Sequence, residues 1–67
     1  MEIMFNNQPI TVSEATTLES VLKTNGLLDK KGIAVAVNAS VIQKVNWTNT
    51  KLKTNDKIMV ITATAGG

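Results

Sequence analysis

The sequence predicts an α+β fold in which one helix packs on one face of a mixed sheet of four to five strands. Short segments rich in apolar and β-branched residues are separated by turn-forming residues. Only one segment has apolar residues at helical spacing. At 67 residues, the chain is expected to form a single domain over residues 1–67.

The N-terminal part predicts a β-hairpin. Residues 2–6 alternate as a strand does, with Met4 on the face opposite Ile3. Residues 6–9 are turn formers, and residues 10–12 follow as a short second strand.

Residues 16–26 contain the predicted helix. Its N-cap is either Thr16, in capping-box spacing, or Thr17. Gly26 suits a left-handed C-terminal cap. The helix presents one apolar stripe, formed by Leu18, Val21 and Leu22.

The middle of the chain predicts a second hairpin, with strands at residues 33–37 and 41–42. Residues 43–50 lack a periodic pattern, and we expect Trp47 to anchor this loop on the edge of the core rather than to bind a partner. Residues 51–53 are expected to form a short edge strand whose lysines discourage edge-to-edge pairing.

Residues 57–63 predict a central strand, because both of its faces are apolar. One helix covers only one face of a sheet, so Met59 and Ile61 are expected on the other face. Met4 lies beside them if the first and last strands pair. These residues form either a partner-docking surface or a shallow secondary core, and the sequence leaves both interpretations open.

The strand leads without a turn into residues 64–67, which we expect to be a flexible tail. Ala65, Gly66 and Gly67 carry almost no side-chain bulk, so the tail can enter a narrow channel in extended form. The competing interpretation is an ordinary frayed chain end.

The composition argues against an enzyme, because the chain has no cysteine and no histidine and its five acidic residues form no evident pair. We expect no bound metal. The absence of arginine and the scarcity of aromatic residues argue against nucleic-acid binding. The chain has no apolar stretch of membrane-spanning length and no leader, so a soluble cytoplasmic protein is expected.

Charge is distributed unevenly along the chain. Residues 1–29 contain one lysine and four acids, whereas residues 30–67 contain six lysines and one acid. The basic half can steer the protein toward an acidic partner surface or a phosphate-bearing site. Solvated lysines on an exposed face are the alternative. The lysines considered for steering are Lys44, Lys51, Lys53 and Lys57.

The order of elements, the length and the ending Ala65, Gly66 and Gly67 together resemble the ubiquitin-like β-grasp sulfur carriers, most closely the ThiS-type carriers of thiamin biosynthesis. The resemblance covers the whole chain. Its other supporting residues are Asn6, Thr17, Leu18, residues 35–38, Trp47 and Asp56. The chain departs from the family at residues 43–44 and 54–56, and it is more basic than the members considered.

The resemblance implies a carrier protein rather than an enzyme. A ThiF-type (E1-like) adenylating enzyme would use ATP and Mg²⁺ to activate the Gly67 carboxylate, and a sulfur-donor enzyme would supply the sulfur of the resulting thiocarboxylate. Thiazole synthase, a ThiG-type enzyme, would receive that sulfur. The chain itself would bind no cofactor, and the catalytic residues would belong to its partners.

Three alternatives remain open. The chain could resemble the small subunit of molybdopterin synthase, or be a ubiquitin-like modifier joined to lysines through Gly67. It could also be a non-covalent β-grasp binding module whose C-terminus has no chemical role.

Overall fold

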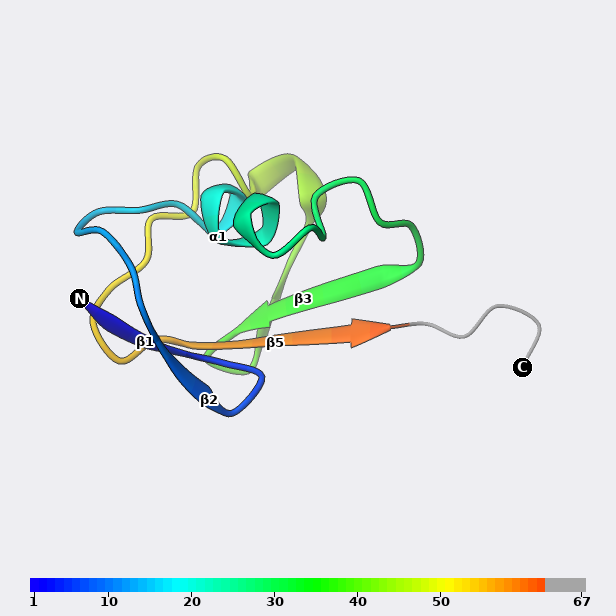
Figure 1. The fold of residues 1–67 in the computed structure, drawn as a ribbon. Helices are drawn as coiled ribbons and strands as arrows, with labels where there is room; N and C mark the ends of the chain where they lie inside the picture. Colours follow the sequence, from blue (N-terminus) through cyan, green and yellow to red (C-terminus); the bar gives the residue numbers. More distant parts are fainter. Residues whose placement is uncertain (63–67) are drawn as a thin grey trace.

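The structure, a computed structural model, describes residues 1–62. It confirms the α+β fold, with one helix and a five-stranded mixed sheet (Figure 1). The elements are β1 (Glu2–Phe5), β2 (Gln8–Thr11), α1 (Leu18–Thr24), β3 (Ile33–Val37), β4 (Ser40–Ile42), the 3₁₀ helix η1 (Lys44–Asn46) and β5 (Lys57–Thr62).

The strand order is β2-β1-β5-β3-β4, which confirms that the last strand is central. β5 runs parallel to β1 and antiparallel to β3. β1 with β2 and β3 with β4 form the two predicted hairpins. Helix α1 lies across one face of the sheet (Figure 1). The opposite face, called the outer face here, carries no helix among residues 1–62.

The core lies between α1 and the sheet. Alternation along the strands turns every second residue toward the helix. The buried side chains therefore come from both layers and from the loop between β4 and β5, and together they form one cluster. Its members are Ile3, Leu18, Val21, Leu22, Val35, Trp47, Leu52 and Ile58.

Both ends of α1 are capped by local interactions. The Oγ1 atom of Thr17 accepts a hydrogen bond from the backbone N–H of Ser20, so Thr17 rather than Thr16 is the N-cap. Gly26 follows the C-cap with φ +72°, in the left-handed region predicted for it. The N–H of Leu27 then donates to the carbonyl of Leu22 at 2.8 Å, as in a Schellman motif.

The prediction of an edge strand at residues 51–53 is wrong. Lys51 forms only an isolated bridge with Thr17, next to the start of α1. The N–H of Leu52 donates to the carbonyl of Thr16 at 2.8 Å, and the Leu52 side chain is buried in the core. This segment therefore pairs with the residues before α1 instead of extending the sheet. The edge strands of the sheet are β2 and β4.

Trp47 confirms its predicted anchoring role and lies deeper than expected. Its side chain is buried in the core cluster, and its Nε1–H donates to the carbonyl of Ile42 at 3.0 Å. The bond ties the loop after β4 to the strand itself.

Within the described part of the chain, no helix is long and apolar enough to cross a membrane.

Candidate functional site

The candidate site begins at the C-terminal end of β5. Thr62 is the ladder partner of Ile33, the first residue of β3. We call this pair the tail root. The predicted site residues Ala65, Gly66 and Gly67 lie outside the described residues. What the structure describes is the strand from which they continue.

Two asparagines fix β5 to its neighbours. After β1 ends, the Oδ1 atom of Asn6 accepts a hydrogen bond from the N–H of Val60 at 2.8 Å. At the first residue of β5, the Oδ1 atom of Asn38 accepts a hydrogen bond from the N–H of Lys57 at 2.9 Å. The Nδ2 group of Asn38 donates to Asp56, which also accepts from a backbone N–H. Side chains thus continue the ladder where neighbouring strands stop.

Both asparagines belong to two-residue hairpin loops. Asn6 and Asn7 have φ +49° and +68°, and Asn38 and Ala39 have φ +51° and +71°. Two successive positive φ values are typical of type I′ turns, which match the twist of the flanking strands. Asparagine tolerates this conformation, so one residue serves both the turn and the hydrogen bond to β5.

The structure places Met4, Met59 and Ile61 on the outer face, as predicted. Met4 is the ladder partner of Lys57, so it shares the face of Met59 and Ile61. Met4 and Met59 line one hollow of about 470 Å³, whereas Ile61 lies farther along β5 beside Ala34. The side chain of Met59 is 38% exposed and that of Ile61 is 55% exposed.

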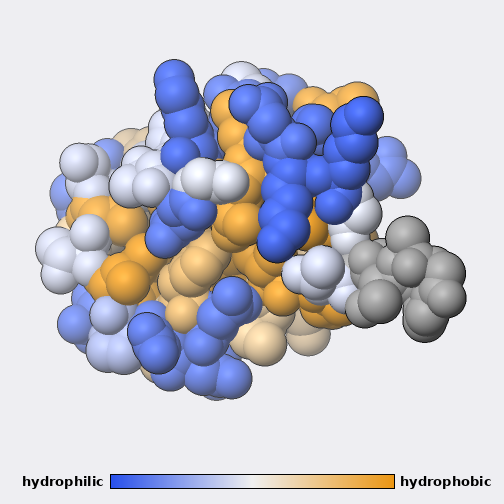
Figure 2. Space-filling model, turned by 45° about the vertical axis from the view of Figure 1, so that its right-hand side comes forward, coloured by the Kyte–Doolittle hydropathy of each residue, from blue (hydrophilic) through white to orange (hydrophobic). Residues whose placement is uncertain are grey.

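Apolar residues of the neighbouring strands widen this surface. Ala36 lies between Met59 of β5 and Val41 of β4 in the ladder. Val41 is 67% exposed. Figure 2 shows the molecule from the side, with the helix layer above and the sheet below, and the apolar atoms across its middle lie between these two layers rather than on the outer face. We call the set Met4, Ala36, Val41, Met59 and Ile61 the outer-face patch.

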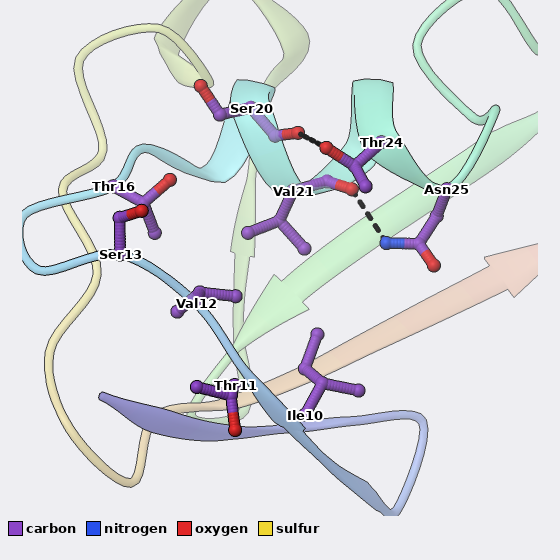
Figure 3. Close-up of a pocket in the computed structure, with 9 residues that line it drawn as sticks. All are labelled: Ile10, Thr11, Val12, Ser13, Thr16, Ser20, Val21, Thr24 and Asn25. Atoms are coloured by element: carbon purple, nitrogen blue, oxygen red, sulfur yellow. Dashed lines mark hydrogen bonds between the residues drawn. The ribbon is translucent and has the colours of Figure 1, made fainter.

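A larger hollow of about 760 Å³ lies between β2 and α1, with Ile10, Val12 and Val21 among its apolar lining (Figure 3). The side chains of Thr24 and Asn25 both donate to backbone carbonyls of the helix, at 3.0 and 2.7 Å. No charged residue lines the hollow. It therefore offers no group for acid–base chemistry.

The four lysines considered for steering do not form one group. Lys57 lies on the outer face, Lys51 pairs with Thr17, and Lys53 donates its backbone N–H to Asp56. Lys44 instead lies over the Trp47 ring, with Nζ 6.0 Å from the ring centroid.

Sequence reasoning missed a different basic cluster, formed by Lys44 with Lys30 and Lys31 beside the start of β3. The adjacent lysines at 30 and 31 were visible in the sequence, but their proximity to Lys44 depends on the β3–β4 hairpin. Among residues 1–62, no cluster of acidic side chains could hold a metal ion.

The comparisons with known proteins agree on one family. The model of the ThiS family matches residues 2–67. The chain is 28% identical over 69 residues to the sulfur carrier protein ThiS of Escherichia coli K12, with both chains fully covered.

Solved structures show the same fold. The crystal structure of the thiamine biosynthesis protein ThiS from Geobacter metallireducens matches with a TM-score of 0.85, 22% identity and full coverage of both chains. A solution structure of a thiamine biosynthesis protein from the same organism matches with a TM-score of 0.76 and 22% identity, covering all of this chain and 88% of that one.

Proposed function

The chain belongs to the ThiS family, and we propose that it is a sulfur carrier of thiamin biosynthesis whose sulfur-carrying residue is Gly67. The observation that carries the proposal is the family match through residue 67, together with the full-length match to the Escherichia coli sulfur carrier. The described structure supports it, because the central strand β5, paired with β3 as far as Thr62, precedes the proposed reactive end in the sequence.

In the proposed reaction, the Gly67 carboxylate attacks the α-phosphorus of ATP, and pyrophosphate leaves. A partner adenylating enzyme binds ATP and Mg²⁺ and provides the catalytic groups. A donor enzyme then supplies sulfur at the sulfide level, which attacks the acyl carbon and displaces AMP, and this gives the thiocarboxylate. Thiazole synthase consumes this group as its sulfur source. The carrier is thus a protein co-substrate, and we place it in the cytoplasm with these enzymes.

The proposed contribution of this chain is reach and orientation. Five residues follow Thr62 in the sequence, and an extended segment of that length spans at most about 17 Å. Gly66 and Gly67 have no Cβ, so such a segment fits a narrow channel. Hydrogen bonds from the backbone N–H groups of β5 to the Oδ1 atoms of Asn6 and Asn38 limit motion of the strand that precedes the tail. Prior positioning of this kind lowers the entropic cost of the reaction.

We assign docking on the adenylating enzyme to the outer-face patch. Its apolar side chains lie on β5 and the strands beside it, on the face that carries no helix among residues 1–62, and the tail follows β5 in the sequence. Exposed Met and Ile side chains on one face are typical of interaction surfaces. A partner that covers this patch would hold the tail root at the entrance of the channel that leads to its active site.

The test is the intact mass of the protein after incubation with a thiamin-pathway adenylating enzyme, Mg-ATP and a sulfur source. We expect a gain equal to the replacement of one oxygen by sulfur. A variant that lacks Gly67 is the control and should gain nothing. If the wild-type chain gains no sulfur from an enzyme that loads its own carrier, the proposal is wrong. In cell extracts, a ladder of forms linked to other proteins would instead indicate a ubiquitin-like modifier.

A further inference from the structure

A basic hollow of about 360 Å³ lies next to the tail root, on the side of β3 away from β5. We call it the lysine pocket. Lysine side chains from two separate segments border it, and an apolar floor lies between them. Its defining residues are Lys30, Lys31, Ile33, Val41, Lys44 and Trp47.

The hollow exists because β4 is shorter than β3. β4 ends at Ile42, opposite Val35, so Ile33 has no partner on that side within the described structure. The N–H of Asn38 donates toward β5, and backbone groups alternate in direction along an antiparallel strand. The N–H and C=O of Ile33 therefore point into the space that β4 leaves free.

The charge in this hollow has one sign. Lys30, Lys31 and Lys44 are all exposed, and no acidic residue lines the hollow. Within residues 1–62, none of the three is in an ion pair. Asp29 is adjacent in sequence but is not among the lining residues. The Lys44 ammonium nitrogen lies 6.0 Å from the centroid of the Trp47 ring, at the outer limit of a cation–π contact.

The distance along the chain decides which anion these lysines can meet. The reacting carboxylate of Gly67 is five residues beyond Thr62, up to about 17 Å when extended. The lysine pocket lies beside Ile33, which pairs with Thr62. A nucleotide phosphate at the far end of an extended tail is therefore out of reach, whereas the entrance of a channel that admits the tail surrounds the tail root.

From the proposed function, we infer that the lysine pocket receives a carboxylate-bearing segment of the adenylating enzyme at the entrance of its tail channel. The lysine ammonium groups complement the charge of the acidic side chains, and the N–H of Ile33, which has no partner among residues 1–62, can donate to the same segment. Such rim charges speed association and fix orientation more than they add binding energy. The lysine pocket would thus guide the tail into the channel, while the outer-face patch supplies apolar contact.

The experiment compares two charge-reversed carriers in the adenylation assay with Mg-ATP. The first carries Lys30→Glu and Lys31→Glu. The matched control carries Lys51→Glu and Lys53→Glu, which give the same net charge in the segment that precedes β5. We expect the first variant to raise the KM for the carrier at least tenfold at low salt, with kcat little changed. The control should raise it less than threefold.

Salt and ATP titrations complete the test. The KM of the wild-type carrier should rise with ionic strength, and that dependence should weaken in the variant with Lys30→Glu and Lys31→Glu. Equal effects of both variants would contradict the inference, because only net charge would then matter. A raised KM for ATP instead of for the carrier would also overturn it. If the wild-type carrier is not adenylated at all, the proposed function itself fails.

Discussion

At the residue scale, the asparagines of the two hairpin turns connect local conformation to the position of the tail. Asn6 adopts a positive φ and also accepts the hydrogen bond from Val60, 54 residues later in the chain. Asn38 has the same two roles toward Lys57. A single residue type therefore meets a turn requirement and completes the hydrogen bonding of β5.

Substitutions of Asn6 should separate these two roles. We expect Asn6→Gly to lower the free energy of unfolding by about 1 kcal/mol, the usual contribution of one hydrogen bond. Asn6→Ala should cost about 2 kcal/mol, because alanine also resists a positive φ. Asn6→Asp keeps an acceptor oxygen and should cost the least. Urea denaturation measures all three, and a glycine variant as stable as the wild type would show that the side-chain bond contributes nothing.

At the scale of elements, β5 separates two environments. Ile58 and Val60 face the helix layer, whereas Met59 and Ile61 face outward. The same strand therefore contributes to the core through one face and to the outer-face patch through the other. Because one helix covers only one face of the five-stranded sheet, the other face carries no helix among residues 1–62.

Replacement of Met59 and Ile61 by glutamine distinguishes a docking surface from a shallow secondary core. If the patch docks, the doubly substituted protein should keep its stability within about 1 kcal/mol. Its KM in the adenylation assay should rise at least tenfold. The control is Val45→Gln, which changes a side chain that is 78% exposed on η1. A loss of stability with an unchanged KM would support the secondary core instead.

At the scale of the whole molecule, one small core supports both layers. The chain has no disulfide and, in residues 1–62, no acidic cluster that could hold a metal ion. A domain of this size therefore depends on a few buried side chains. The total free energy of unfolding expected for 67 residues is about 3 to 10 kcal/mol.

Truncation of Ile58 should therefore affect the whole fold. Its side chain is completely buried in the central strand, and Ile58→Ala is expected to cost about 2 to 5 kcal/mol. That loss is a large fraction of the total stability. Urea denaturation gives the value, with Val45→Ala as an exposed control that should change stability by less than about 0.5 kcal/mol. A cost below about 1 kcal/mol for Ile58→Ala would show that the core tolerates this cavity.

The sequence determined the features that depend on near neighbours. Alternation marked β1 and β3, a run of β-branched residues marked β5, apolar spacing marked α1, and Gly26 marked its end, because period and backbone preference act over a few residues. The central place of β5 could also be predicted, since both of its faces are apolar.

Tertiary structure decided the features that join distant segments. Residues 51–53 have the composition of an edge strand, but Leu52 gains more by entering the core, so the segment pairs with Thr17. The hydrogen bond from Val60 to Asn6 and the proximity of Lys44 to Lys30 follow from strand order and register. No local pattern encodes these contacts, because register is selected by the burial of the whole sheet against its helix.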